Sequence, residues 1–182
     1  MRLLPLLATL FFLPFSLLAQ HIPLMEDLEE ERPKYRAALL IGHTLIPDEH
    51  AGEHFFIPSW GLDLEYWFQE HWGMGLHSDV ELESYVVFHQ NGSELMERNL
   101  PVVVTLDALF KPWRGLVLQV GPGIELERSE NLPLVRMGLE YEIELRNHWD
   151  LSPTIFYDGR FHSDVMRRVS TWSVALGVGK RF

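Results

Sequence analysis

The C-terminal stretch Trp172-Ser-Val-Ala-Leu-Gly-Val-Gly-Lys-Arg-Phe182 decides the fold class. Large apolar side chains alternate along it with small or polar ones, a period of two that is typical of a β-strand with one apolar face. The apolar set is Trp172, Val174, Leu176, Val178 and Phe182. Its length suits the roughly 9–11 residues that a tilted strand needs to cross a bilayer. Lys180 interrupts the face near the expected membrane boundary, where a long aliphatic stem can snorkel to water.

Seven earlier segments repeat this alternation, at residues 34–46, 58–69, 73–86, 99–110, 115–127, 134–146 and 151–159. The clearest is Leu139-Glu-Tyr-Glu-Ile-Glu-Leu145, because a helix would scatter its glutamates around the axis. With the last strand, from about 169 to 182, the total is even, which brings both ends of a closed antiparallel barrel to one side. We therefore predict an all-β fold over residues 34–182, an eight-stranded antiparallel transmembrane β-barrel.

Three short predicted turns, at residues 70–73, 111–114 and 147–150, each contain a tryptophan. Longer links alternate with them, at residues 47–57, 87–98, 128–133 and 160–168. We predict short turns on the periplasmic side and longer loops outside the cell, the usual asymmetry of such barrels. The aromatic residues expected at the periplasmic end are Trp72, Trp113, Trp149 and Phe182. They predict an interfacial girdle, with ordinary turn packing as the alternative.

The N-terminus predicts export. Met1-Arg2 is followed by an almost wholly apolar run to Ala19, which indicates a signal peptide over residues 1–19, with an uncleaved anchor as the alternative. Residues 20–33 form an acidic lead, expected in the periplasm and either resting on the barrel or acting as a solvated linker. The chain has no cysteine, and its formal charge of −11 argues against nucleic-acid binding, which needs a basic surface.

The terminal aromatic, the strand count and the tryptophan-bearing turns resemble the small OmpA/OmpX-like class of outer-membrane barrels over residues 34–182. The resemblance implies the outer membrane of a diderm bacterium, contact with its lipid, and recognition of the C-terminal strand by the barrel-assembly machinery. It implies no reaction and no cofactor. A soluble eight-stranded barrel such as a lipocalin is the alternative, with its apolar face turned inward around a ligand.

The polar faces of the predicted strands carry many carboxylates, which a membrane barrel would turn inward. The acidic candidates are Asp63, Glu65, Asp79, Glu81, Glu83, Glu125, Glu140, Glu142 and Glu144. The expected counter-ions are Arg36, His77, Arg136 and Arg146. A tight turn at 70–72 would place Glu65 opposite His77 and Asp63 near Asp79, and Glu125 should lie near Arg136. Two interpretations stay open: a structural ion-pair network, or a lumen that binds or passes small cations.

The first long loop and its flanks hold imidazoles and carboxylates, which are ligands for zinc, copper or nickel. The candidates are His43, Asp48, His50 and His54, with Glu49 and Glu53 nearby, although their spacing fits no fixed motif and exposed loop residues are the alternative.

His162-Ser163-Asp164 has the residue types of a hydrolase, but neighbours on an extended chain point apart. We therefore predict no catalytic residue. The expected role is structural, adhesive or supportive, with the loops as a contact for another envelope protein. A narrow cation channel or metal-binding barrel is the second hypothesis, and a lipid A-modifying enzyme the third.

Overall fold

A computed structural model describes residues 33–48, 53–88, 94–127, 131–161 and 168–182. The predicted signal peptide, all of the acidic lead except Pro33, and residues 162–164 lie outside the described residues. None of the helices in the described part of the chain reaches the length and hydropathy that crossing a membrane requires.

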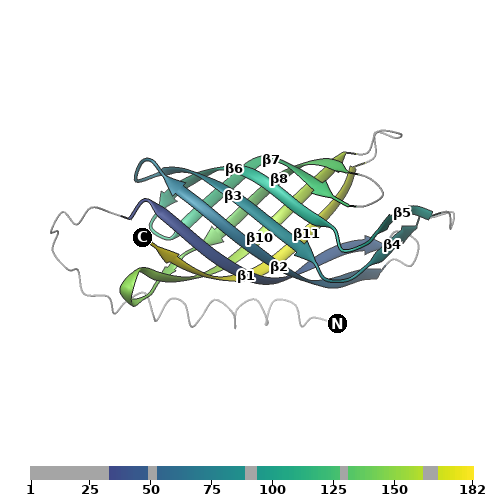
Figure 1. Ribbon diagram of the computed structural model, residues 1–182, viewed down its shortest axis with the longest axis horizontal. Helices are drawn as coiled ribbons and strands as arrows, with labels where there is room; N and C mark the ends of the chain where they lie inside the picture. Colours follow the sequence, from purple (N-terminus) through teal and green to yellow (C-terminus); the bar gives the residue numbers. More distant parts are fainter. Residues whose placement is uncertain (1–32, 49–52, 89–93, 128–130, 162–167) are drawn as a thin grey trace, which may run out of the picture. The chain divides into compact units, whose positions relative to one another are not determined.

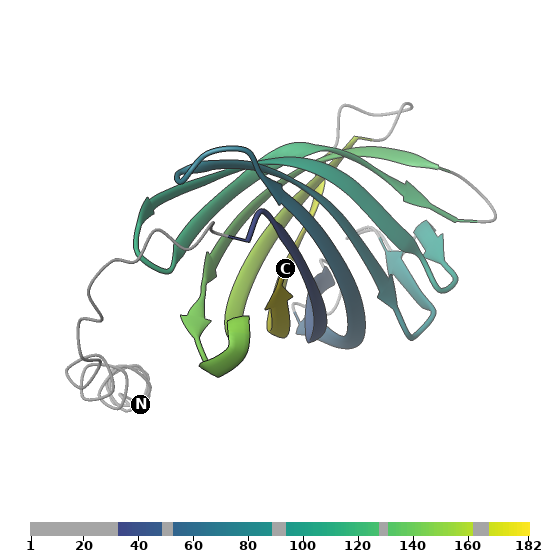
Figure 2. The same ribbon diagram turned by 60° about the vertical axis from the view of Figure 1, so that its left-hand side comes forward.

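Eight long strands form one barrel, and they run obliquely around it (Figures 1 and 2). They are β1 (Tyr35–Asp48), β2 (Glu53–Trp67), β3 (Trp72–Glu81), β6 (Val102–Trp113), β7 (Leu116–Leu126), β8 (Leu132–Tyr141), β10 (Trp149–Phe161) and β11 (Arg168–Arg181). Every neighbouring pair is antiparallel, and β11 pairs with both β10 and β1, so the sheet closes. The predicted eight-stranded antiparallel barrel is confirmed.

The seam between the first and last strands is regular. Leu39 lies opposite Val178 in an antiparallel register that continues along ten residue pairs. Beyond β11, Tyr35 and Phe182 exchange backbone hydrogen bonds of 3.1 and 3.0 Å. Phe182 and the links β2–β3, β6–β7 and β8–β10 lie at one end of the barrel, here named the turn end, and the other links between consecutive long strands lie at the opposite, loop end.

The link between β3 and β6 departs from the prediction. Residues 73–86 were expected to form one strand, but β3 ends at Glu81 and a separate two-stranded ribbon follows, β4 (Tyr85–Phe88) with β5 (Glu94–Arg98). The β3–β6 ladder ends at the pair Val80 and Val102. Pro101 comes next. Its carbonyl oxygen accepts from Glu81 N at 3.1 Å, but Pro101 has no N–H to donate in return, so the ladder ends there.

The turn before β10 also contains short elements. β9 (Ile143–Glu144) pairs with β10, and the 3₁₀ turn η2 (Arg146–His148) follows it. Asn147 and His148 both have positive φ, 61° and 62°, which reverses the chain within a few residues. The predicted strand over residues 134–146 is therefore divided and ends two residues earlier.

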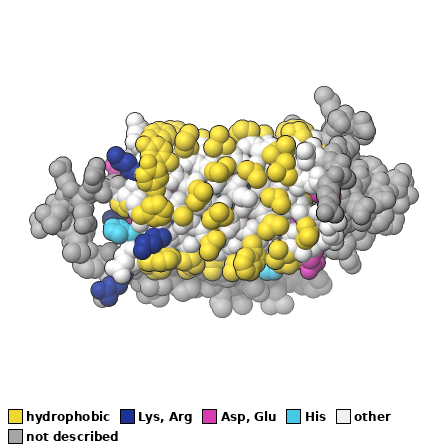
Figure 3. Space-filling view, viewed as in Figure 1, with side chains coloured by type: hydrophobic (Ala, Val, Ile, Leu, Met, Phe, Trp, Pro, Cys, Tyr) yellow, Lys and Arg dark blue, Asp and Glu magenta, His cyan; other side chains and the backbone are white. Residues whose placement is uncertain are grey.

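The two faces of the strands differ sharply in chemistry. Along β3, exposed and buried residues alternate, and the same alternation runs along β6, β7 and β8. Apolar side chains cover the outward face (Figure 3), whereas charged side chains and glycines share the inward face. Gly121 shows why glycine is needed there: a Cβ at this position would lie 2.1 Å from the backbone oxygen of Leu106. Glycine thus leaves room for the charged groups of adjacent strands.

Candidate functional site

A cluster of buried charges fills the half of the interior nearer the turn end. At its centre Arg36, fully buried, is hydrogen-bonded to Asp150 (Nη2 to Oδ1, 2.6 Å) and to Glu65, and it forms a 2.8 Å ion pair with Glu140. Its Nη2 also donates to Ser152 Oγ at 3.0 Å. One guanidinium therefore serves three carboxylates from three different strands, a charge-assisted network that fixes their relative positions.

Trp67 closes this cluster toward the turn end. Its indole packs with Leu109 and Val117 as a small apolar core, and its Nε1 donates to Glu65 Oε2 at 2.7 Å. Lys111 and Arg181 lie over the ring at 4.8 and 5.8 Å, distances suited to cation–π attraction.

The two cations also share a counter-ion, since both bind Glu142. Sequence reasoning missed this role of Trp67. The signal was present, because Trp67 has the same strand parity as Glu65.

His77 occupies the middle of the interior, between two carboxylates. Its Nδ1 lies 2.8 Å from Asp63 Oδ1 and its Nε2 lies 3.5 Å from Asp107 Oδ2. The prediction that Glu65 lies opposite His77 is wrong, because Asp63 pairs with His77. Asp79 pairs with Gly61, which makes it a diagonal neighbour of Asp63, in agreement with the prediction that these two carboxylates lie near each other. The first pair after the turn is Trp67 and Gly73, so residues 68–72 form a longer connection than the predicted turn at 70–72, and the register shifts by two residues.

Two more arginines organise the half nearer the loop end. Arg136 holds Asp158 through two hydrogen bonds of 2.7 and 2.8 Å and binds Asp79 as well. Arg160 binds Glu125 and lies 3.5 Å from Glu81.

The predicted neighbourhood of Glu125 and Arg136 is wrong for a reason of register. Gly121, not Glu125, lies opposite Arg136, and Glu125 lies opposite Leu132. The partner of Glu125 is Arg160, which lies beyond the predicted end of its strand.

Most of the charged residues that the sequence singled out are buried, and three are exposed. Glu65, Glu81, Glu125, Glu140 and Glu142 are buried, and so are Asp63, His77 and Arg136, while Asp79 is partly buried. Glu83 and Glu144 are exposed, which corrects their predicted inward positions, and Arg146 is exposed too. Glu83 follows the end of β3, and Glu144 lies where the sheet gives way to the η2 turn. Charged interior residues that the sequence did not single out are Asp107, Lys111, Asp150, Asp158, Arg160 and Arg181.

Carboxylates outnumber basic groups in this interior. Among the described residues, nine carboxylate side chains are buried, against three guanidiniums and His77. Every buried arginine is paired, which limits the desolvation cost of burying charge. The excess of buried charged groups in this interior therefore consists of carboxylates.

The structure brings one possible metal-binding set together within the described residues. Oxygens of Glu65, Glu140 and Glu142 lie within 4.8 Å of one another. Arg36, Lys111 and Arg181 already bind these carboxylates, so the protein supplies its own cations there.

The predicted loop metal site is not assembled from described side chains. His43 is exposed on the outward face of β1. His50 lies outside the described residues, as do the side chains of Asp48 and His54. The metal site therefore stays a prediction from the sequence.

The four aromatic girdle candidates lie at the turn end. Trp72 and Trp149 begin their strands, Trp113 ends its strand, and Phe182 follows β11. All four are exposed, Trp113 by 70%. Trp72 contacts Phe110 (ring centroids 4.5 Å apart) and Lys180 lies over Trp149 at 5.1 Å.

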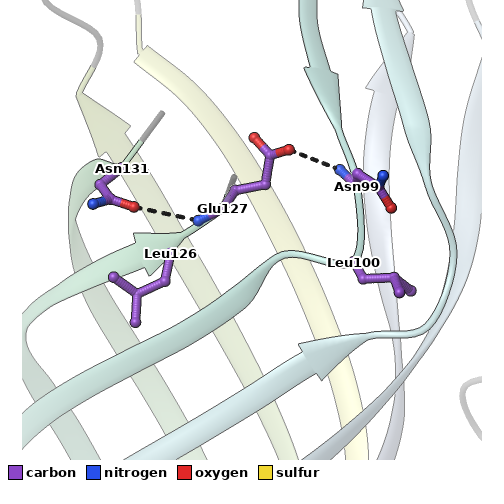
Figure 4. A pocket seen from close by; sticks show the side chains of 5 residues that line it. All are labelled: Asn99, Leu100, Leu126, Glu127 and Asn131. Atoms are coloured by element: carbon purple, nitrogen blue, oxygen red, sulfur yellow. Dashed lines mark hydrogen bonds between the residues drawn. The ribbon is translucent and has the colours of Figure 1, made fainter. Parts of the chain in front are cut away.

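A pocket lies at the loop end, between the chain that enters β6 and the chain that leaves β7 (Figure 4). We name it the rim pocket, and its lining residues are Asn99, Leu100, Leu126, Glu127 and Asn131. Two hydrogen bonds of 3.3 Å connect its walls, from Asn99 N to Glu127 Oε1 and from Glu127 N to Asn131 Oδ1.

Solved structures with the same fold are small bacterial outer-membrane barrels. Neisserial surface protein A is 11% identical, with a TM-score of 0.58, over 84% of this chain and 100% of that one. OprG from Pseudomonas aeruginosa is 14% identical (TM-score 0.57; 86% and 99% coverage). Ail, the attachment invasion locus protein of Yersinia pestis, solved with the heparin analogue sucrose octasulfate, is 14% identical (TM-score 0.56; 83% and 99%). Neither a protein-family model nor a curated protein matches the chain. The chain therefore has the fold of a small outer-membrane β-barrel.

Proposed function

We propose that this protein is an integral outer-membrane β-barrel with a structural or adhesive role, which presents its loops to another envelope protein. The proposal rests on the polarity of the two faces of the strands, because the outward face is apolar and the inward face is charged. Among the described residues, 33 large apolar side chains are exposed and 11 hydrophobic residues form the buried core. A soluble monomer rarely exposes a continuous apolar patch of more than a few hundred Å². Lipid is the solvent that suits the outward face, and a lipocalin-like arrangement would reverse the two faces.

The exposed aromatic residues support an orientation in the membrane. Trp72, Trp113, Trp149 and Phe182 lie at the turn end, level with the interfacial region in which indole rings concentrate. The turn end would then face the periplasm and the loop end the exterior. Export by residues 1–19 and recognition of β11 by the assembly machinery belong to the same proposal.

The ion-paired interior supports a scaffold role over transport. Side chains fill an eight-stranded barrel, and here Arg36, Arg136 and Arg160 each bridge strands across the interior. Trp67 and its two cations cover the turn end. The loops are then the part of the molecule left to contact partners.

Extraction and gel migration test the membrane assignment. We expect the protein to need detergent for solubility and to migrate faster on a gel when unheated than after boiling, because the closed barrel resists unfolding by detergent. Protease added outside intact cells should cut within the loop-end links and spare the turns. A protein that stays monomeric in buffer without detergent would contradict the proposal.

A narrow cation-selective channel is the second candidate, favoured by the surplus of buried carboxylates. Planar bilayers distinguish the two functions. The scaffold predicts no resolvable current. The channel predicts a cation-selective current that Glu140→Gln with Glu142→Gln abolishes and that Trp67→Ala increases, while the exposed control Glu83→Gln leaves it unchanged.

A further inference from the structure

The rim pocket is large enough to hold a small molecule. Its volume is about 500 Å³, within the range of roughly 300–1,000 Å³ that is usual for ligand pockets. Leu100 and Leu126 provide apolar wall, and both are substantially exposed. Asn99, Glu127 and Asn131 provide polar groups around it (Figure 4).

Hydrogen bonds orient these polar groups in advance of any ligand. Glu127 N donates to Asn131 Oδ1 (3.3 Å), and Ser84 Oγ donates to Asn99 Oδ1 (2.9 Å). Since each carboxamide oxygen is held as an acceptor, the NH₂ group is the part that each asparagine can offer a ligand. Glu127 Oε1 accepts from Asn99 N (3.3 Å), which fixes the carboxylate beside them. The pocket therefore combines two amide donors with one charged acceptor.

Leu100 gives an independent reason to assign a role here. Its φ is 50°, in the left-handed region, which an aliphatic residue adopts at a cost of about 1–3 kcal/mol. No burial offsets the cost, because the residue is 51% exposed. Strain held at an exposed apolar residue is better explained by a ligand that uses the side chain than by packing.

We infer that the rim pocket binds a saccharide ring, with the apolar face of the ring against the two leucines and its hydroxyls bonded to Asn99, Glu127 and Asn131. A sugar presents this combination of an apolar face and donor–acceptor hydroxyls. Among the described lining residues Glu127 is the only charged one, and its carboxylate would accept hydrogen bonds from the hydroxyls of the sugar.

The position of the pocket suggests where such a sugar comes from, and this step rests on the proposed function. Leu126 ends the outward apolar face of β7, so the pocket lies where the outer-leaflet head groups of a membrane barrel begin. The sugar is then part of a glycolipid in that leaflet or a free oligosaccharide outside the cell.

Titration of the full-length mature chain in a polyoxyethylene detergent, which contains no sugar, tests the inference. The two probes are purified lipopolysaccharide and the core oligosaccharide released from it by mild acid, with binding followed through the side-chain NH₂ signals of Asn99 and Asn131 in NMR. Glu127→Gln keeps the shape and removes the charged acceptor, so we expect about tenfold weaker binding. Glu83→Gln is the control, an exposed acid at the same end.

A second variant separates function from stability. Leu100→Gly relieves the positive φ and removes an apolar wall, so binding should weaken several-fold while thermal stability is kept or raised. Binding of both probes, or of the lipid-linked probe alone, with loss in both variants, supports the inference and identifies the source. No binding of either probe, or binding that both variants leave unchanged, overturns it. Gel migration of the same sample reports the membrane assignment separately, and the free oligosaccharide can be titrated even if that assignment fails.

Discussion

The outward and inward faces of the same eight strands obey different rules. Outside, apolar side chains such as Val120 and Met137 lie side by side on neighbouring strands, and many apolar substitutions would serve as well. Inside, each charged group depends on particular partners: Arg36 needs carboxylates from three other strands, and Gly121 needs to lack a side chain. The outward face is thus specified by composition and the inward face by pairing. Substitutions on the two faces should therefore differ in size and in kind.

The largest effect is expected at Arg36. Arg36→Leu leaves Glu65, Glu140 and Asp150 buried without their shared cation, which should cost about 3–5 kcal/mol of unfolding free energy. Urea unfolding of protein folded into lipid vesicles measures it. Arg181→Leu is the matched control and should cost less, because Lys111 still pairs with Glu142. Equal losses in the two variants would show that the interior is not organised around Arg36.

A charge placed on the outward face should have the next largest effect. Val120→Arg puts a guanidinium near the middle of β7, in the hydrocarbon, at an expected cost of about 2–4 kcal/mol. Leu145→Arg, in the exposed link before η2, should cost at most about 1 kcal/mol, since the interface hydrates the charge. The same vesicle assay applies. A fully soluble barrel would tolerate both substitutions alike, and that result would contradict the contact of the outward face with lipid.

Two glycines differ in the space that the structure leaves for a Cβ atom. Gly121→Ala should cost about 1–3 kcal/mol, because its Cβ meets the backbone oxygen of Leu106 at 2.1 Å. Gly159→Ala should change stability by less than about 0.5 kcal/mol, because the nearest atom to a Cβ there lies at 3.7 Å. Thermal unfolding of the two variants beside the parent protein decides between them. A similar loss at both sites would mean that glycine is needed for backbone freedom and not for space.

The smallest expected effect is at the turn end. Trp113 is outward and highly exposed, so Trp113→Phe should change stability by about 0.5 kcal/mol or less. The substitution should instead change the tryptophan fluorescence of the protein. Quenching of tryptophan emission by brominated lipids should fall in Trp113→Phe and stay unchanged in Trp67→Phe, because the barrel wall shields Trp67 from lipid. Loss of quenching in both variants would contradict the inward position of Trp67.

The sequence predicts one of the two faces well. Alternation is a local property, so residues 172–182 reveal a strand without reference to any other residue. The count of strands and their order follow from it. The exposure of Trp113 does not, because Trp113 has the parity of the buried residues of β6 and a register shift lies between Phe110 and Trp113. The ends of strands are harder, because Pro101 stops the β3–β6 ladder from the opposite strand and nothing within residues 73–86 announces it.

The ion pairs of the interior could not be predicted from the alternation of side chains. Arg36 and Asp150 are 114 residues apart, and their contact depends on closure of the whole sheet. A two-residue change in the turn after Trp67 transfers His77 from Glu65 to Asp63, which periodicity cannot detect because both partners share one parity. Arg160 was overlooked because the predicted strand stopped one residue short of it.

The seam between β1 and β11 separates architecture from chain connectivity. Tyr35 and Phe182 are hydrogen-bonded as closely as partners inside the sheet, so each of the eight long strands has two neighbours and none is an edge strand. A circular permutant that joins these ends by a short linker and opens at the Arg114-Gly115 turn would retain every ladder. Such a molecule would have the same barrel without a terminal aromatic strand. It would therefore show whether the cell recognises the finished shape of this protein or the residue on which its chain stops.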